Sequence, residues 1–308
     1  MFKFLKKSIK FGYLYTHSIG HMCTEAEIWY LNHGLNKALK VFWLNSGAIC
    51  NREMYNLISK KLYFITDTVG SKVLKIFVKF TRNSKYNGNS IVNEFTVHIQ
   101  DDSDISFPIP VNWQDDFENL KTSLGLNLKK YVCLVVRDNL YSKNISDKVA
   151  NDTEYRNSDI NNYKLGILTL IKKGYEVIRV GSIANKCNFQ MNGFIDYTNS
   201  SFRNERNDIL LLANCEFVVS TGSGIDEIAT LYRKPVYLLN ILPVGGLRLT
   251  KLRPYVCPKG LKFTESGREL TLKEIYSLQL WNANSSDSYA NKGVEIIDMN
   301  QNQIVESV

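Results

Sequence analysis

The residues best suited to chemistry form a short loop that follows an apolar strand. The run 217–226 reads FVVSTGSGID, so a buried strand passes directly into small residues and then into a helix. Gly222 and Gly224 allow the backbone to approach a ligand closely, and free N–H groups at the helix start favour a phosphate. The predicted ligand-binding residues of this loop are Ser220, Thr221, Gly222, Ser223 and Gly224.

A simpler interpretation of the same loop is helix capping. Ser223 is a good N-cap residue, and Asp226 stands three residues later, where a capping box has its acidic partner. Both interpretations can hold together. Two nucleotide-binding motifs are absent: Gly224 is not followed by the third glycine of a dinucleotide fingerprint, and the sequence contains no P-loop.

Arginines close two neighbouring predicted strands. Arg137 and Asp138 follow one strand, and Arg179 with Gly181 follows the next. Parallel strands bring their carboxyl ends to one edge of a sheet, so we expect both guanidinium groups to hold a pyrophosphate. Alternatively, the arginines pair with carboxylates of the same region: Asp138, Asp159 and Asp196.

A histidine and a glutamate near the N-terminus suit proton transfer. The predicted turn 18–21 ends in His21, whose imidazole titrates near neutral pH and could accept a proton from an attacking hydroxyl. Glu25 lies one helical turn later and could orient that ring. The alternative is a helix-capping segment with a hydrogen-bonded histidine.

A basic stretch covers residues 245–263. It has no acidic residue of its own and suits substrate phosphates or a membrane head group, or is a solvated loop. Its charged residues are Arg248, Lys251, Arg253, Lys259 and Lys262.

Strands and helices alternate in the segments that must position these residues. In the second half, apolar runs at 131–136, 175–180, 217–220 and 236–239 alternate with helical patterns, which predicts a doubly wound parallel sheet. The first half reads as strand 11–16, helix from 25, strand 40–44 and helix 51–62. Further strand or helix is expected at 72–80, polar turns at 82–90 and an exposed loop at 281–293.

Composition describes a folded protein that prefers anionic partners. The 308 residues include 44% hydrophobic and 22% charged residues, and the net charge is +8. Six scattered cysteines indicate reduced, mostly buried thiols in the cytoplasm, and four histidines without zinc spacing predict no metal. Basic–aromatic RNA-binding motifs are absent, so we expect no nucleic-acid partner.

The N-terminus does not read as a secretion signal or a membrane span. Lys6, Lys7 and Lys10 interrupt its apolar core, and the sequence holds no run of about 18 apolar residues. Its basic and aromatic character is compatible with loose contact at the inner face of the membrane. The preferred interpretation is a strand or helix with solvated lysines. The sequence carries no signal for oligomeric state.

Several short motifs together resemble a family of bacterial glycosyltransferases of GT-B type found in surface-polysaccharide gene clusters. The resemblance is strongest from about 130 to 245 and touches the N-terminal half mainly at 18–27. The matching residues are Ile19-Gly20-His21-Met22 with Glu25 and Glu27, Val136-Arg137-Asp138, Tyr155-Arg156-Asn157-Ser158-Asp159-Ile160 with Asn162-Tyr163, Gly174 to Gly181, Asp196-Tyr197, Ala213-Asn214-Cys215, Ser220 to Gly224, Pro235-Val236, and Asn240 with Pro243.

The resemblance implies a GT-B-like α/β fold: two Rossmann-like domains with parallel sheets facing a central cleft. Residues 1–115 would form the acceptor-side domain and 116–308 the nucleotide-sugar-binding domain, with Asn240 among its ligand residues. It further implies sugar transfer from a nucleotide-activated donor to a surface glycan or lipid-linked acceptor. Neither a metal nor a separate cofactor is needed, because helix N-termini and arginines can stabilise the leaving diphosphate.

The sequence departs from the family pattern at two places, and other functions stay open. Val135 stands where the family leads us to expect histidine, and Asp226 and Glu227 make the helix after Gly224 unusually acidic. If the reaction retains anomeric configuration, no base such as His21 is required. The alternative functions are a GT-B-like sugar-nucleotide epimerase or hydrolase, and a non-catalytic nucleotide- or polyanion-binding protein.

Overall fold

A computed structural model describes residues 9–33, 40–45, 48–64, 103–126, 130–245, 247 and 250–308. The segments predicted at 72–80 and 82–90 lie outside the described residues, as do Arg248, Lys6 and Lys7. We call 9–64 the N-terminal unit and 130–308 the C-terminal unit. A long helix, α6 (Gln114–Leu124), stands between them in the sequence, and the predicted boundary between residues 115 and 116 lies inside it.

The C-terminal unit is built on a six-stranded sheet in the order β6-β5-β4-β7-β8-β9, and every pair is parallel. Its strands are β4 (Tyr131–Val135), β5 (Glu176–Arg179), β6 (Phe194–Ile195), β7 (Val218–Ser220), β8 (Val236–Ile241) and β9 (Val256–Pro258). This confirms the predicted parallel α/β sheet. The strand order reverses between β4 and β7, and sheets of this kind bind ligands beyond the carboxyl ends of the strands at such a point.

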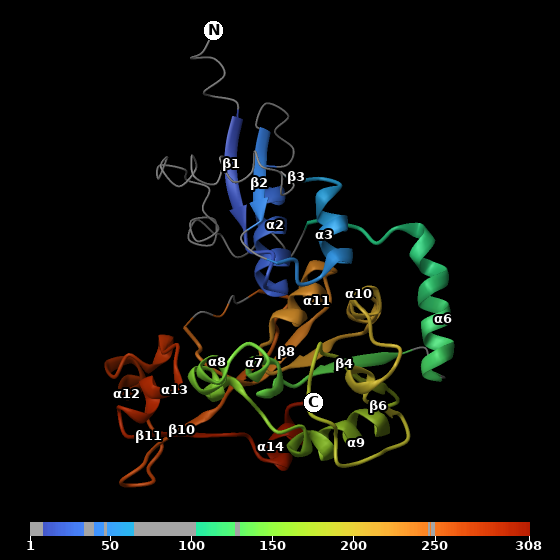
Figure 1. Cartoon of the computed structure of the whole chain (residues 1–308). Helices are drawn as coiled ribbons and strands as arrows, with labels where there is room; N and C mark the ends of the chain where they lie inside the picture. Colours follow the sequence, from blue (N-terminus) through green and yellow to red (C-terminus); the bar gives the residue numbers. More distant parts are fainter. Residues whose placement is uncertain are drawn as a thin grey trace.

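Helices cover both faces of this sheet (Figure 1). Apolar residues of α9 (Lys164–Lys172) and α14 (Gln301–Glu306) pack against one face, and those of α10 (Glu205–Asn214) and α11 (Glu227–Leu231) pack against the other. Strand β4 is buried along its whole length, because both of its faces are covered. Further helical segments are α7 (Leu140–Lys143), α8 (Asp147–Asp152) and the 3-10 turns 111–113, 154–156, 160–163, 197–199, 224–226 and 280–282.

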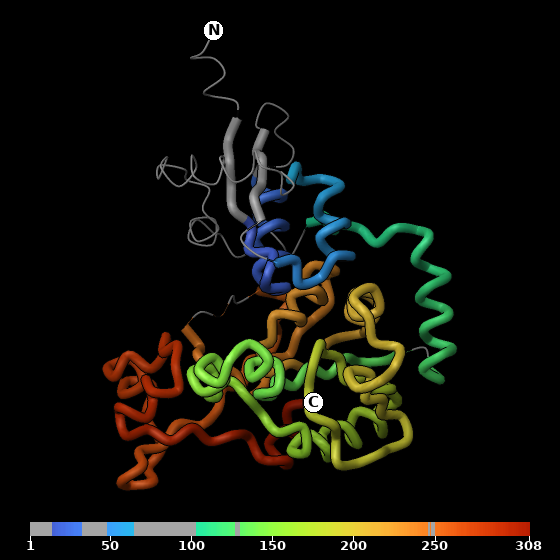
Figure 2. The backbone as a smooth tube through the Cα atoms, in the orientation of Figure 1, coloured from blue at the N-terminus to red at the C-terminus, as the bar shows by residue number. Residues whose placement is uncertain are grey.

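The region after β9 forms a smaller lobe, which is traced in orange and red in Figure 2. Strands β10 (Gly260–Phe263) and β11 (Val294–Ile297) pair antiparallel and join α12 (Leu272–Ser277) and α13 (Ser286–Ala290). Most residues of the predicted exposed loop at 281–293 are exposed, but the segment contains helix α13, and Ala283 and Tyr289 are buried in the core of this lobe. The polar residues that indicated a loop include Ser285, which is the N-cap residue of α13.

The N-terminal unit contains a three-stranded parallel sheet in the order β1-β2-β3, with helices α2 (Ile19–His33) and α3 (Arg52–Ser59). Its strands are β1 (Ile9–Leu14), β2 (Lys40–Asn45) and β3 (Tyr63–Phe64). The predicted strands at 11–16 and 40–44 and the helix at 51–62 are confirmed. The turn predicted at 18–21 is wrong: helix α2 already begins at Ile19, so His21 lies in its first turn.

One hydrophobic cluster joins the two units. Met22 and Ala26 of α2 belong to the same buried cluster as Ile225 and Ile228 of the C-terminal unit. A buried ion pair crosses the same contact, since Arg233 Nη1 lies 2.8 Å from Glu27 Oε1. Helix α2 is therefore held against the C-terminal unit by apolar packing and by charge.

Gly20 allows the closest approach between the units. A Cβ atom at this position would lie 2.9 Å from the Cα atom of Gly224, a backbone atom that cannot rotate away. We expect Gly20→Ala to lower the free energy of unfolding by about 1–3 kcal/mol, as overpacking does. Urea unfolding measures this. The matched control is Gly260→Ala, whose Cβ would meet Ile297 Cβ at 3.4 Å and the Ile297 carbonyl oxygen at 3.6 Å, which are ordinary contacts. Equal losses in both variants would contradict the prediction.

Candidate active site

A cavity of about 830 Å³ lies where the two units meet. One wall is the start of α2, and the other is the carboxyl edge of the large sheet, including the segments that follow β4, β5, β7 and β8. This is the edge at which the strand order reverses. A volume in this range is typical of sites for small molecules.

Nine of the twelve predicted site residues line this cavity, from both units. They are His21, Glu25, Arg137, Asp138, Arg179, Gly181, Gly222, Ser223 and Gly224. Ser220, Thr221 and Asn240 are buried and do not line it. The strand ends and the α2 segment therefore meet at one cavity, as predicted. Ser220, Thr221 and Asn240 instead make buried contacts behind it.

The loop after β7 is braced by its own residues. The Ser220 hydroxyl donates to Asp226 Oδ2 over 2.5 Å and accepts a hydrogen bond from the Gly222 N–H over 3.0 Å. The Ser223 N–H donates to the same carboxylate oxygen over 3.1 Å. The capping interpretation is therefore confirmed. These loop N–H groups were predicted to meet a phosphate, but Asp226 and Ser220 already accept from them.

Thr221 and Asn240 tie together segments behind the cavity. The Thr221 hydroxyl accepts the Arg137 N–H over 2.9 Å, which fixes the backbone where β4 ends. The Asn240 amide donates to the Tyr163 hydroxyl over 3.0 Å and accepts from the Met299 N–H over 2.7 Å. The prediction that Asn240 contacts a ligand is corrected, because its amide nitrogen and oxygen serve these buried contacts.

Two arginine side chains face the cavity without a carboxylate partner among the described residues. Arg137 donates to the hydroxyls of Ser142 and Thr153 over 3.0 and 3.1 Å. Arg156 donates to the Gly222 carbonyl over 2.7 Å, so it also holds the loop after β7. Hydroxyl and carbonyl partners accept hydrogen bonds but carry no negative charge, and the buried Arg137 Nε has no hydrogen-bond partner in the described part of the chain.

The electrostatics of this pair favour an anion. Burial, followed by repulsion from Arg156, lowers the pKa of Arg137 to about 10. A pKa of about 10 keeps the Arg137 guanidinium charged at neutral pH, where Arg156 repels it. Placing an anion between or beside them would relieve the repulsion and the cost of burying charge.

Arg179 pairs with carboxylates, which is the alternative that the sequence left open. Its side chain is 0% exposed, and its guanidinium lies 3.6 Å from Asp138 and 3.5 Å from Asp196. It also donates to the Asn185 carbonyl over 2.6 Å. Arg179 therefore supports the cavity wall by pairing with acids and is not a free partner for a diphosphate.

His21 and Glu25 form a contact of the kind that orients a general base. Their Nδ1 and Oε1 atoms are 2.9 Å apart, which agrees with the predicted one-turn spacing. The imidazole is 59% exposed, whereas the carboxylate is 1% exposed. A buried carboxylate at Nδ1 orients the ring, which makes Nε2 the candidate atom for contact with a substrate hydroxyl. Because Gly20 touches Gly224, the pair lies beside the loop after β7.

The basic stretch does not form one anion-binding patch. Arg253 lies 2.6 Å from Glu227, Lys259 lies 2.7 Å from Asp298, and Lys262 lies 3.9 Å from Glu269. The acidic partners come from other segments of the chain, so neither the phosphate-binding nor the solvated-loop interpretation describes Arg253 and Lys259. Arg253 does line the cavity, but as a paired residue.

Sequence reasoning gave no role to Arg156 or to an apolar wall of the cavity. Arg156 was noticed only within a family motif, and no spacing links it to Gly222, from which it is separated by 66 positions. The exposed part of this apolar wall lies outside the periodic core pattern of the sequence and consists of Tyr141, Ile145 and Ile183.

Comparison with known proteins gives a match in fold. The crystal structure of a glycosyl transferase family 9 protein from Veillonella parvula aligns with a TM-score of 0.52, covering 97% of this chain and 95% of that chain at 8% identity. The two chains share a fold. ADP-heptose LPS heptosyltransferase II of E. coli aligns at 0.43, with 12% identity over 75% of this chain and 84% of that chain.

The iron-containing dodecameric glycosyltransferase TibC of E. coli aligns at 0.44, with 13% identity over 80% of this chain and 62% of that chain. Scores below 0.5 add nothing to the fold assignment. No protein-family model matches the chain, and the search of curated proteins found no match.

No group of three or more His, Cys, Asp or Glu side chains among the described residues is arranged to hold a metal ion. In the same part of the chain, no helix combines the length and the apolar character that crossing a membrane requires. All six cysteines are free thiols.

Asp208, on the cavity wall, makes stability depend on pH. Burial raises its pKa to about 6, although Arg203 and Tyr197 partly offset the effect. The folded pKa thus exceeds the unfolded value, so stability should fall as pH rises through about 4 to 6, by roughly 3 kcal/mol in total. Asp208→Asn should flatten this slope. Urea unfolding of both proteins across this pH range checks it; parallel slopes would contradict the assignment.

Proposed function

We propose that this protein is a glycosyltransferase that moves a sugar from a nucleotide-activated donor to a surface glycan or lipid-linked acceptor. The observation that carries the proposal is the cavity between the units. On one wall it has an accessible histidine held by a buried carboxylate, and on the other a pair of arginines without acidic partners. The fold shared with a family 9 glycosyltransferase supports this choice.

In this proposal, the arginines bind the donor diphosphate. Arg137 and Arg156 neutralise its charge and stabilise the additional charge that develops as the sugar bond breaks. Asp138 and Arg179 act indirectly: Asp138 accepts from the Asn185 N–H over 2.6 Å and pairs with Arg179, which fixes the loop after β5. Gly222 contributes its carbonyl as the anchor of Arg156, and its φ of +77° suits glycine.

His21 acts as the general base in an inverting transfer. Its Nε2 atom takes the proton of the acceptor hydroxyl as that oxygen attacks the sugar, while Glu25 stabilises the imidazolium that forms. The N-terminal unit then supplies the acceptor side and the C-terminal unit the donor side, as in a two-domain GT-B arrangement. No metal ion is required, because the two guanidinium groups supply the positive charge at the diphosphate. Free thiols suit the reducing cytoplasm, where such donors are made.

A thermal-shift panel tests the binding half of this proposal. The panel contains UDP-, GDP-, ADP-, CMP- and dTDP-sugars, with free sugars and a random oligonucleotide as controls. A donor at about 100 times its Kd should stabilise the folded protein by about 2.7 kcal/mol. No shift with any nucleotide sugar, combined with a salt-sensitive shift with the oligonucleotide, would instead identify a polyanion-binding protein.

A further inference from the structure

A second groove lies on the outer side of the same contact between the units. It has a volume of about 580 Å³ and is lined by residues of α3, α6 and α10, including Glu53, Asp116, Glu205 and Arg206. The reaction cavity is lined by Asn51, Arg203 and Asp208 from the neighbouring turns. The contact between α3 and α10 is therefore the partition between the outer groove and the reaction cavity.

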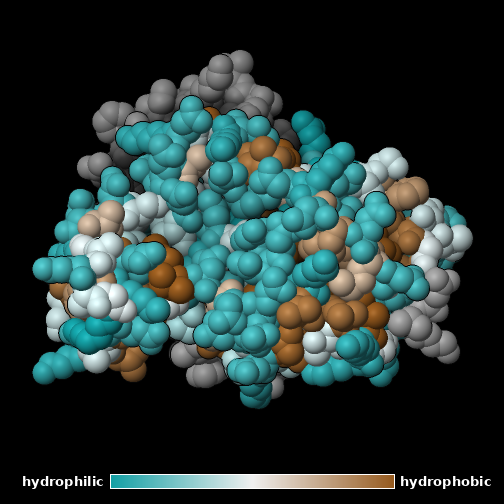
Figure 3. Space-filling view, turned by 90° about the horizontal axis from the view of Figure 1, so that it is seen from below, coloured by the Kyte–Doolittle hydropathy of each residue, from teal (hydrophilic) through white to brown (hydrophobic). Residues whose placement is uncertain are grey.

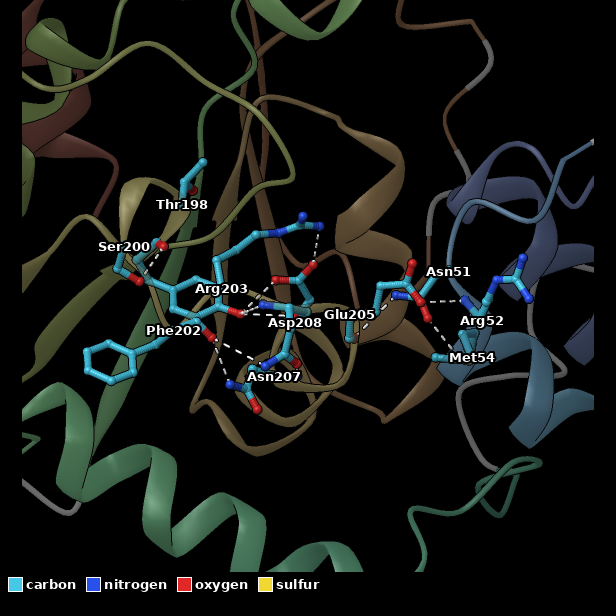
Figure 4. Close-up of polar contacts among 12 residues, drawn as sticks. Asn51, Arg52, Met54, Thr198, Ser200, Phe202, Arg203, Glu205, Asn207 and Asp208 are labelled. Carbon is cyan, nitrogen blue, oxygen red and sulfur yellow. Dashed lines mark hydrogen bonds and ion pairs between the residues drawn. The ribbon is translucent and has the colours of Figure 1, made fainter.

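Glu205 holds this partition at the first turn of both helices (Figure 4). Its carboxylate accepts the Arg52 N–H over 2.6 Å, and its backbone carbonyl accepts from the Asn51 amide over 3.3 Å. The first N–H groups of a helix lack partners within the helix and carry partial positive charge, so a carboxylate is a favourable acceptor for them. One side chain of the C-terminal unit thereby caps a helix of the N-terminal unit.

Arg206 joins three helices at the same place. Its guanidinium lies 2.9 Å from Glu53 of α3 and 2.7 Å from Asp116 of α6, and it stacks 4.6 Å above the Trp113 ring. The hydrogen bond with Asp116 raises the pKa of Arg206, so the guanidinium stays positively charged. Together, the adjacent residues Glu205 and Arg206 bind α10 to α3 and α6.

We propose that Glu205 and Arg206 form a latch that keeps the outer groove separate from the reaction cavity and so closes one end of that cavity to water. The latch itself consists of charged groups near the surface, while apolar residues of α3 and α10 belong to one buried cluster behind it. Its opening therefore loosens the rim of the contact without unfolding either unit. In the closed state, Asn51 and Cys50 form the cavity wall, and Arg203 and Asp208 stand on the facing unit. Once open, the two spaces merge and solvent enters beside Cys50.

Cys50 reports directly on the latch. Its side chain lines the reaction cavity, next to Asn51, and burial raises the pKa of the thiol to about 11. Alkylating reagents react with the thiolate, so Cys50 should react slowly while the latch is closed. Opening restores water around the sulfur, which increases both its access and its thiolate fraction.

The test measures iodoacetamide alkylation of Cys50 by peptide mass spectrometry in the full chain, with Cys257 as the internal reference. We expect Glu205→Ala, Glu205→Gln and Arg206→Ala to increase the Cys50 rate at least about fivefold, while the Cys257 rate stays constant. The control is Arg268→Ala, which breaks an equally short ion pair with Glu274 at 2.6 Å, away from both grooves. Its Cys50 rate should match that of the wild type.

Hydrogen exchange separates a broken latch from a general loss of structure. Glu205→Gln should speed exchange in the peptide that carries the Arg52 amide, whereas β4, at the centre of the large sheet, should keep its protection. Faster exchange at Arg52 with an unchanged Cys50 rate would overturn the proposal. So would unchanged exchange at Arg52 in Glu205→Ala.

Closure of the latch should also protect the reaction from water; this consequence rests on the proposed function and is measured in a separate assay. An open cavity admits water that competes with the acceptor, so the latch variants should raise the ratio of donor hydrolysis to sugar transfer about tenfold with a nearly constant donor KM. A constant ratio in variants with fast Cys50 alkylation would mean that the latch does not protect the reaction. If no nucleotide sugar is turned over by the wild type, the proposed function fails, while alkylation still decides the latch.

Discussion

Arg137→Ala and Arg156→Ala should each weaken the binding of a nucleotide-sugar donor by roughly 10- to 100-fold. Hydrogen bonds to charged groups contribute about 1.5–3 kcal/mol, and each 1.4 kcal/mol corresponds to tenfold in Kd. These arginines have no carboxylate partner among the described residues. Removing one arginine therefore removes a positive group that would bind the ligand and leaves no carboxylate of the protein unpaired. Isothermal titration with the donor found in the thermal-shift panel measures the effect.

Two further variants make this result specific. Arg137→Lys keeps the charge but loses the planar fork, so it should bind the donor at an intermediate strength. Arg268→Ala removes an exposed arginine of the outer lobe and should leave donor affinity unchanged. Raising the salt concentration should weaken binding to the wild type more than to either alanine variant. Donor affinity equal to that of the wild type in both Arg137→Ala and Arg156→Ala would remove the proposed diphosphate site.

His21→Ala should lower kcat by about 10² to 10⁴-fold, the usual contribution of a positioned base. Donor affinity should change less than about twofold, since the arginines on the opposite wall hold the diphosphate. In the wild type, kcat should rise with pH as the imidazole loses its proton, and His21→Ala should lose that dependence. Steady-state kinetics over a pH series, with separate donor titrations, measures all of these effects.

Glu25→Gln provides the matched comparison for the base. The amide retains an oxygen near His21 Nδ1, which Glu25 Oε1 approaches to 2.9 Å, but it cannot stabilise an imidazolium by charge. We expect a loss in kcat smaller than that of His21→Ala, with the pH dependence shifted and not abolished. Unchanged turnover in His21→Ala would exclude the base and favour a retaining reaction, for which no such base is required.

Local patterns were enough to predict the large sheet. Strands such as β4 and β7 are short apolar runs that end in polar or small residues, and the intervening helices show clear periodicity. Parallel order then follows from the alternation, and with it the meeting of Arg137 and the loop after β7 at one edge. The contact of His21 with Glu25 was also accessible, because a helix fixes the distance between residues four apart.

Contacts between distant segments could not be derived in the same way. Arg156 joins the cavity because it reaches the Gly222 carbonyl. Arg179 also lines the cavity, but it pairs with Asp138 and Asp196 and is not free to bind a diphosphate. The start of α2 was missed since Gly20 disfavours a helix by intrinsic propensity. That glycine is needed there because the Gly224 backbone leaves no room for a Cβ atom. Tertiary packing thus overrides the local preference.

The face seen from below is largely hydrophilic, with apolar residues in separate groups (Figure 3). That view offers no broad apolar surface to compete with the cavity as the principal ligand site. In the proposed function, a donor diphosphate and an acceptor hydroxyl meet in the cavity between the units.

Product analysis with the best-binding donor tests this claim most directly. The protein is incubated with the labelled nucleotide sugar, with and without a lipid-linked or glycan acceptor, and the products are separated by chromatography and identified by mass spectrometry. The account predicts that free nucleotide appears in step with glycosylated acceptor, that both require the acceptor, and that His21→Ala produces neither at a comparable rate. Free sugar or an epimeric nucleotide sugar formed at full rate without acceptor would contradict it and identify a hydrolase or an epimerase.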